Sequence, residues 1–199
     1  TPRKAANRMR LHQAPHLSKG RSKFPGLIPI CMKRCHKEEL MATIFWPLQS
    51  NIIRRNAVSN TFGMVRKFSS GAAKPHQGWD FSAKVQTPAF AIADGSVAFV
   101  RDKGDYGLQL CLEFEFDGTT LFAFYAHLYK IYVTEGDTIQ ANQLVAASGE
   151  SGNAKGMVEE DQHLHFEIRT KAYAGLGLAD RLSPLHVFGK CPLYQVIPG

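Results

Sequence analysis

Alternating apolar and polar side chains mark the clearest element of this 199-residue chain. From Leu108 to Phe116 every second residue is apolar, and Glu113 and Glu115 lie among the residues between them. Side chains of a β-strand point alternately to its two faces, so this segment predicts a strand with one face in a hydrophobic core. Cys111 falls on the face of the glutamates, yet its apolar surroundings favour a small buried hydrophobe.

Turn signals separate this strand from several shorter apolar runs. Asp94-Gly95 and Asp117-Gly118 are dipeptides typical of tight hairpin turns. We expect a loop at residues 148–153, and further strands at residues 90–92, 97–100, 121–127, 131–133, 144–147 and 163–169. Hairpins at this density, without a long amphipathic helix, predict a mainly β fold with an antiparallel sheet or sandwich core.

Positive charge is confined to the start of the chain. The net charge is +7, but residues 1–40 contain ten Lys or Arg and two acidic residues, whereas residues 41–199 contain fourteen and fifteen. Nucleic acid is therefore not an expected partner of the main domain. We expect a basic, Pro-containing N-terminal arm at residues 1–45 and a folded domain at residues 46–199. The arm could be a solvated tail, dock a partner or cover the active site.

Neither a membrane span nor a signal peptide is recognisable in the sequence. No run approaches the roughly 18–20 consecutive apolar residues of a membrane span, and the basic N-terminus lacks the apolar region of a signal peptide. An even number of cysteines permits two disulfides in an oxidising compartment; they are Cys31, Cys35, Cys111 and Cys191. Cys31, Cys35 and His36 lie close together but lack the paired spacing of a structural zinc module.

Candidate chemistry is concentrated at five residues. His76 and Asp80 are four residues apart in His-Gln-Gly-Trp-Asp, and either a helix or a strand and loop could bring them together. His163 and His165 flank one leucine and so share one face of their expected strand. His127 lies between these two motifs. Histidine and carboxylate groups suit zinc, so the pattern indicates a metal site built on a sheet.

Three of these residues would suffice for a hydrolytic zinc site, which usually has three protein ligands and one water. His76, Asp80 and His165 make a set of two histidines and one carboxylate, and His127 and His163 remain nearby. A histidine beside such a metal can take a proton from the water or donate a hydrogen bond to an oxyanion.

Other polar residues have weaker signals. Glu167 shares the strand face of His165, where it could either orient that histidine or have a structural role alone. Four further histidines have no comparable context and are expected to be structural or exposed: His12, His16, His36 and His186.

Taken together, the motifs resemble those of the lysostaphin-type (LytM-like) zinc metallopeptidases, which cut the peptide part of peptidoglycan. The similar segments lie at residues 60–66, 76–80, 87–97, 125–128, 133–137, 148–153, 163–169 and 183–185. The resemblance extends from about residue 58 to residue 189. It implies the family's β fold for the domain and a peptidoglycan endopeptidase that binds one zinc ion per chain.

The resemblance also implies a role for each of the five candidate residues. The metal ligands are His76, Asp80 and His165, and the free catalytic histidines are His127 and His163. Which of these two is the base is left open. All five positions are filled, which favours an enzyme over the alternative, a non-catalytic peptidoglycan-binding regulator with the same fold.

Three segments depart from the family's pattern. Gln86 stands where the family usually has glycine, residues 140–143 replace a Lys/Gly-rich turn, and Asp161-Gln162 replaces the usual Gly-Pro before His163. The last change lies on a loop at the rim of the groove in the family fold, so we expect it to affect substrate preference and not metal chemistry. A Gly–Gly bridge and a D-Ala–diaminopimelate cross-link both fit a site of this kind.

The implied substrate carries an expectation about location. An enzyme that acts on peptidoglycan peptide stems is expected to be exported and to work in the periplasm or cell wall. One hypothesis is a secreted antibacterial effector, which would need an immunity or inhibitor protein as a partner in the producing cell.

Overall fold

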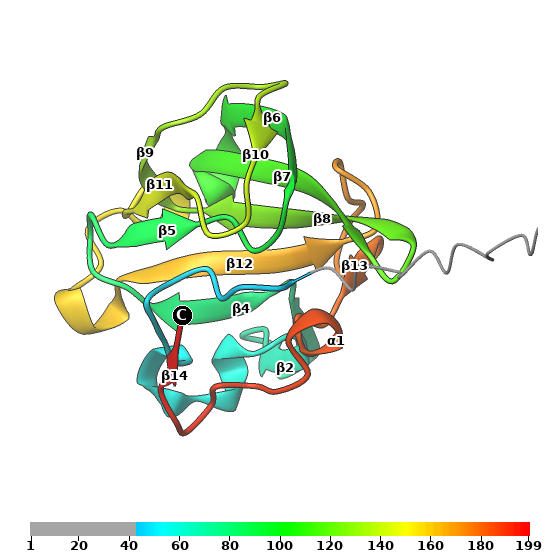
Figure 1. The fold of residues 1–199 in the computed structure, drawn as a ribbon. Coiled ribbons are helices and arrows are strands. Elements are labelled where there is room, and N and C mark those ends of the chain that lie inside the picture. The colour runs from blue at the N-terminus through cyan, green and yellow to red at the C-terminus, as the bar shows by residue number, and fades with distance from the viewer. Residues whose placement is uncertain (1–42) are drawn as a thin grey trace, which may run out of the picture. The chain divides into compact units, whose positions relative to one another are not determined.

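A seven-stranded antiparallel sheet forms the framework of the domain (Figure 1). The computed structural model describes residues 43–199. The expectations for residues 1–42 of the basic arm therefore lie outside the described residues, as do those for His12, His16, Cys31, Cys35 and His36. Along the sheet the strand order is β10 (Thr138–Ile139), β6 (Gly95–Asp102), β7 (Leu108–Phe116), β8 (Thr119–Ala126), β12 (His163–Arg169) and β13 (Arg181–Leu182). Strand β4 (Trp79–Ser82) pairs with the edge of β12 that faces away from β8, so β12 lies between β8 and β4 (Figure 1). The predicted mainly β, antiparallel fold is confirmed.

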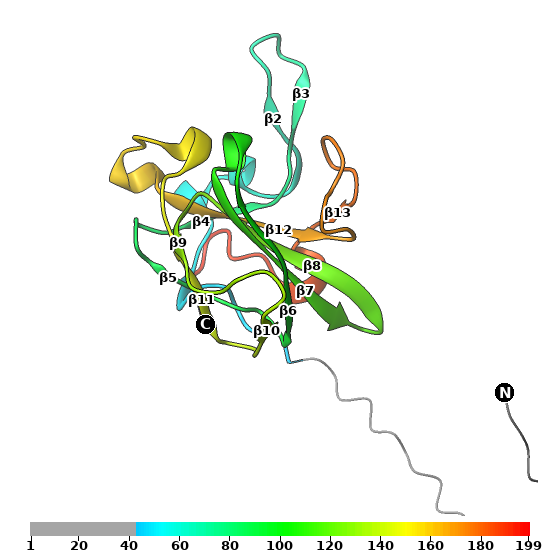
Figure 2. The same ribbon diagram turned by 90° about the horizontal axis from the view of Figure 1, so that it is seen from above.

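Smaller sheets complete the domain. A three-stranded sheet contains β5 (Pro88–Phe90), β11 (Leu144–Ser148) and β9 (Leu128–Ile131). Strands β2 (Gly63–Lys67) and β3 (Ala73–His76) form a hairpin that projects from the rest of the domain (Figure 2), and β1 (Ser50–Asn51) pairs with β14 (Ile197–Pro198).

Helical structure in the described residues is short. The α-helix is α1 (Leu185–Phe188), and 3-10 turns occur at Arg54–Asn56, Val58–Asn60, Gly104–Tyr106, Gly152–Ala154 and Glu159–Asp161. Within residues 43–199, none of these helices has the length and apolar character that a membrane crossing requires.

The main core lies against the apolar face of the large sheet. Leu110, Leu112 and Phe114 of β7 are buried there, as the alternation predicts. Leu164 and Phe166 of β12 join them, so the strand that carries the two histidines is anchored by its opposite face. Burying a side chain such as leucine or phenylalanine contributes about 1.5–3 kcal/mol, so β12 is a firmly held platform.

The other face of the large sheet is only partly polar. The alternation of apolar and polar residues alone would predict a polar face. Cys111 is fully buried in a second cluster with Phe99 and Phe124, as its apolar surroundings predict. This cluster is covered by Tyr106 and by Ala172 from the segment after β12. Glu113 and Glu115 lie beyond that cover and are exposed. Tertiary covering, which alternation does not encode, therefore divides this face.

The expected strands are largely present, although several boundaries move. β12 occupies residues 163–169 as predicted, whereas the strands expected at residues 131–133 and 90–92 begin earlier, at Leu128 and Pro88. The β2–β3 hairpin and β4 were not predicted as strands. In the first of these, Pro75 lies within β3, and a proline inside a run weakens the strand signal.

Candidate metal centre

Strand pairing places the three predicted ligands together. His165 lies directly opposite Asp80 in the β12–β4 pair, and His76 is the last residue of β3. His76 and Asp80 therefore lie on two strands joined by Gln77 and Gly78, and not on one helix. A Cβ atom on Gly78 would lie 2.1 Å from the Phe166 carbonyl oxygen, so glycine permits this close approach to β12.

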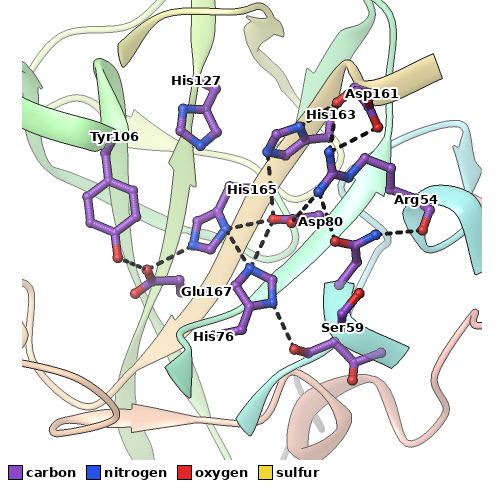
Figure 3. A network of polar contacts seen from close by, with 12 residues as sticks. Arg54, Ser59, His76, Asp80, Tyr106, His127, Asp161, His163, His165 and Glu167 are labelled. Atoms are coloured by element: carbon purple, nitrogen blue, oxygen red, sulfur yellow. Dashed lines mark hydrogen bonds and ion pairs between the residues drawn. The ribbon is translucent and has the colours of Figure 1, made fainter. Parts of the chain in front are cut away.

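The ligand atoms of these three residues converge on one point (Figure 3). Asp80 Oδ1 lies 3.1 Å from His76 Nε2 and 2.8 Å from His165 Nδ1, and the two nitrogens are 3.3 Å apart. Ligand atoms around a tetrahedral zinc ion are roughly 3.3–3.6 Å apart, given bond lengths of about 2.0–2.2 Å. All three side chains are buried. Two of the observed separations are slightly shorter than those around a zinc ion, so the three atoms would move slightly apart to hold one.

Hydrogen bonds on the outer side of each ring favour metal binding on the inner side. His76 Nδ1 donates to the Thr61 carbonyl oxygen at 2.8 Å, and His165 Nε2 donates to Glu167 Oε1 at 3.0 Å. In the neutral tautomers that these bonds favour, the facing nitrogens present lone pairs to the centre of the site and can accept a metal ion. Burial opposes protonation of His165, but its contacts with Asp80 and Glu167 raise its pKa, so a proton can bridge His165 and Asp80 where a metal ion would otherwise lie. Two imidazoles with one carboxylate suit zinc.

Two arginines hold the second oxygen of Asp80, the predicted carboxylate ligand. Arg66 Nη2 donates to Asp80 Oδ2 at 2.6 Å, and Arg54 Nη2 lies 3.5 Å from the same oxygen. Burial opposes ionisation of Asp80, but the contacts with His165 and His76 outweigh it and hold the pKa of this carboxyl well below its usual range. Asp80 is therefore an anion with one oxygen fixed and one directed at the site.

A buried charge network supports His165 from behind. Glu167, with 0% of its surface exposed, accepts hydrogen bonds from His165 and from the Tyr106 hydroxyl through Oε1. Its Oε2 accepts from Arg169 Nε at 2.6 Å and from Arg181 Nε at 2.7 Å. Burial opposes ionisation of Glu167, but the contacts with His165 and Arg169 keep its pKa below the usual range. Of the two roles left open for Glu167, the structure supports orientation of His165, which is a predicted metal ligand.

His127 and His163 lie beside the ligand set and share one kind of anchoring. His163 Nδ1 donates to the Asp161 carbonyl oxygen at 2.8 Å, and His127 Nδ1 donates to the Ser151 carbonyl oxygen at 3.0 Å. The two ring centroids are 5.0 Å apart. Each Nε2 is then free of a proton and available to accept one.

Their surroundings keep both histidines neutral. Burial, followed by the neighbouring His165 and His163, lowers the pKa of His127 to about 3. Burial also lowers the pKa of His163. In addition, His127 follows β8 with a backbone φ of 58°, a conformation that is uncommon for residues other than glycine and that occurs often at functional sites.

These residues open onto a cleft of about 510 Å³. The ligands and the two free histidines line it, together with the β2–β3 hairpin on one side and the turns at Gly104–Tyr106 and Gly152–Ala154. All five sequence-predicted site residues thus line one cavity. A cleft of this size can admit a peptide segment to the metal centre.

Sequence reasoning missed Arg54, Arg66 and Tyr106. Arg66 contacts Asp80 only because β2 pairs with β3, where it lies opposite Lys74, two residues before His76. That register could be inferred once residues 63–76 were recognised as a hairpin. Arg54 and Tyr106 reach the site from other turns, and no local signal identifies them.

Comparison with known proteins agrees with the geometry. The description "Peptidase family M23" matches residues 74–175. An uncharacterized metalloprotease of Haemophilus influenzae is 34% identical over 131 residues, which cover 65% of this chain and 25% of that protein. Peptidoglycan DD-endopeptidase ShyB of Vibrio cholerae is 32% identical over 112 residues, covering 56% and 24%. The chain therefore spans about a quarter of the length of these relatives.

Solved structures show the same fold. The catalytic domain of the antimicrobial peptidase lysostaphin from Staphylococcus simulans matches with a TM-score of 0.52 and 26% identity, over 65% of this chain and 90% of that one. The structure of LytU matches with a TM-score of 0.52 and 29% identity, over 66% and 83%. The family match spans more than half of the chain and includes all five site residues, so the chain belongs to peptidase family M23.

Proposed function

We propose that this protein is a zinc-dependent endopeptidase that hydrolyses the peptide cross-links of bacterial peptidoglycan. The observation that carries the proposal is the convergence of three acceptor atoms from His76, Asp80 and His165 beside two further histidines in one cleft. Relatives named peptidoglycan DD-endopeptidase in Vibrio cholerae and glycyl-glycine endopeptidase in Staphylococcus capitis support a peptide cross-link as the substrate.

Zinc fits the donor set and would supply the nucleophile. His76 Nε2, Asp80 Oδ1 and His165 Nδ1 would hold one ion per chain. When bound, zinc lowers the pKa of its water to about 7 and polarises a carbonyl group. Arg66 and Glu167 keep the carboxylate and one imidazole in place, so the protein supplies a fixed site before the metal arrives.

The two free histidines would move protons and stabilise charge. Each has Nδ1 bound to a backbone carbonyl, which directs Nε2 away from the backbone. A neutral imidazole can accept the proton of the attacking water, and the resulting imidazolium can donate to the developing oxyanion or to the leaving amine. The lowered pKa of His127 keeps it in the accepting form at neutral pH.

The test combines metal content with product analysis. Zinc-loaded wild-type protein should release cleaved muropeptides from isolated sacculi, as measured by mass spectrometry, and EDTA should stop the reaction. His127→Ala and His163→Ala should each retain zinc and lose about 10²-fold or more in rate, the typical contribution of general acid–base catalysis. Failure of fully zinc-loaded protein to cleave any type of cross-linked muropeptide would overturn the proposal.

The alternative is a peptidoglycan-binding regulator with the same fold. Such a protein is expected to lack a ligand or a catalytic histidine, whereas all five are present here and line one cleft. The two functions differ in a co-sedimentation assay. A regulator would bind sacculi without releasing soluble products, and an endopeptidase would release them.

The substrate implies where the protein acts. We place its action in the periplasm or cell wall, where peptidoglycan lies. Two further points stay predictions: that the protein is a secreted antibacterial effector, and that an immunity or inhibitor protein is its partner. The effector prediction is tested by directing the wild-type chain and the His127→Ala variant to the periplasm of a test cell. An effector should lyse the cell as wild type and not as His127→Ala.

A further inference from the structure

We propose, on the basis of the proposed function, that Lys74 binds a free substrate carboxylate beside the scissile amide. The site would then prefer cross-links whose amide nitrogen belongs to a diaminopimelate residue, because that residue keeps a free carboxylate on the same carbon atom. A bridge made of glycine residues has no such charge. Lys74 is thereby a specificity-determining residue and not a catalytic one.

The position of Lys74 in β3 directs it toward the cleft. Lys74 and His76 are two residues apart in the same strand, so their side chains share one face. Lys74 also lies directly opposite Arg66 in the hairpin, and both residues line the cleft that contains the metal ligands. The hairpin that carries Lys74 stands clear of the rest of the domain (Figure 2), so the lysine is open to an incoming peptide.

Charge pairing distinguishes Lys74 from the other cations of the cleft. Arg66 is bound to Asp80 at 2.6 Å, and Arg54 lies within 3.5 Å of both Asp80 and Asp161. Lys74 forms no ion pair with any residue in the described part of the chain, and its ammonium group lies 5.6 Å from the centre of the Phe68 ring. Among the described lysines and arginines that line the cleft, Lys74 is therefore the one whose charge is left for a ligand.

The opposite side of the cleft has the complementary charge. Asp105, in the turn at Gly104–Tyr106, lines the cleft, is exposed and forms no ion pair with another described residue. A cleft with an unpaired cation on one wall and an unpaired anion on another suits a substrate that bears both signs. A diaminopimelate cross-link has free carboxylates on both stems and a free amine on the donor stem, whereas a glycine bridge is uncharged along its length.

The test changes the protein and the substrate together. Two disaccharide-peptide dimers joined by D-Ala–diaminopimelate bonds serve as substrates: one with a free carboxylate beside the scissile amide, and one with that carboxylate amidated. The enzyme variants are the wild type, Lys74→Gln and Lys130→Gln, all zinc-loaded. Lys130 is a matched control, because it is exposed, has its ammonium group 5.4 Å from the Tyr132 ring and does not line the cleft.

The expected result is a loss that depends on the carboxylate. Lys74→Gln should lower kcat/KM for the free-acid dimer by about 5- to 30-fold, between the effects of an exposed ion pair and of a charge-assisted hydrogen bond. Amidation should lower the wild-type value by a similar factor and leave Lys74→Gln nearly unchanged. Lys130→Gln should behave as the wild type on both dimers, and all three proteins should contain one zinc ion.

Two results would overturn the assignment in distinguishable ways. If the wild type cleaves the free-acid dimer and Lys74→Gln cleaves it equally well, or loses the same factor on both dimers, Lys74 does not bind the carboxylate and the proposed function stands. If the zinc-loaded wild type cleaves neither dimer nor any glycine-bridged substrate, the proposed function fails and the assignment of Lys74 fails with it.

Discussion

Glu167→Gln should strongly lower the stability of this domain, although it hardly changes the shape of the side chain. Glutamine has nearly the same size as glutamate but no charge, and it places an NH₂ group where one carboxylate oxygen was. Oε2 of Glu167 accepts from Arg169 and Arg181 at 2.6 and 2.7 Å. In the variant, either these guanidinium groups face another donor or the Tyr106 and His165 contacts at Oε1 are lost.

The magnitude follows from burial. Glu167 is fully buried, and the Arg169 and Arg181 side chains are 2% and 5% exposed, so solvent does not compensate for the lost charge. Removing one partner of a buried ion pair costs about 3–5 kcal/mol, because the other charge is left without compensation. For a domain of this size that loss lowers the Tm by roughly 6–20 °C. Weaker orientation of His165 should also reduce zinc affinity by about 10- to 100-fold.

The assay measures unfolding by urea and zinc binding by competition with a chromophoric chelator. Glu113→Gln is the control, because Glu113 lies on β7 of the same sheet, is exposed and forms no ion pair with another described residue. The control should change the unfolding free energy by no more than about 0.5 kcal/mol. Equal stability and equal zinc affinity of the two variants would refute the account of the Glu167 network.

Three further predictions concern single residues of the same framework. Gly78→Ala should lower the unfolding free energy by at least about 2 kcal/mol, since a Cβ would meet the Phe166 carbonyl; a urea titration matching wild type would contradict this. Burial raises the pKa of Cys111 to about 12, so in the native protein a thiol reagent at pH 8 should modify exposed Cys191 and spare Cys111, as peptide mass mapping would show; equal labelling would oppose it. Because the pKa of His127 is lowered in the folded state, its contribution to stability is present above about pH 6.5 and is lost as the pH falls. Between pH 6.5 and 5, zinc-free wild type should therefore lose up to about 1.4 kcal/mol per pH unit more than His127→Gln in urea titrations, and equal slopes would argue against a neutral buried histidine.

Local pattern was sufficient to predict one half of the candidate site. His163 and His165 lie two residues apart, and the period of a strand places them on one face without knowledge of any partner. The apolar residues between and beyond them fix which face is buried. The boundaries of β12 therefore follow from the sequence alone.

The other half depends on pairing between distant segments. The spacing of His76 and Asp80 is compatible with a helix, but pairing of β4 with β12 makes this segment extended, and Gly78 permits the close approach to Phe166 of β12. Arg66 contacts Asp80 through the register of the β2–β3 hairpin, and strand register depends on long-range contacts. Family resemblance, and not local pattern, assigned His76 and Asp80 their roles as metal ligands.

Burial on the second face of the sheet was equally non-local. Cys111 is covered by the segment after β12, about sixty residues further along the chain, whereas Glu113 on the same face is exposed. Alternation gives both residues the same orientation. The difference arises from a covering segment whose path cannot be derived from β7.

Titration of the zinc-free protein with zinc tests the central claim most directly. Peptide-bond cleavage in a cross-linked muropeptide is measured by mass spectrometry at each ratio of zinc to protein, for the wild type and for His127→Ala. Wild-type activity should rise in proportion to zinc and level off at one ion per chain, while His127→Ala should bind the same amount of zinc with little activity. Full zinc occupancy of the wild type without cleavage, or equal cleavage by His127→Ala, would contradict the claim.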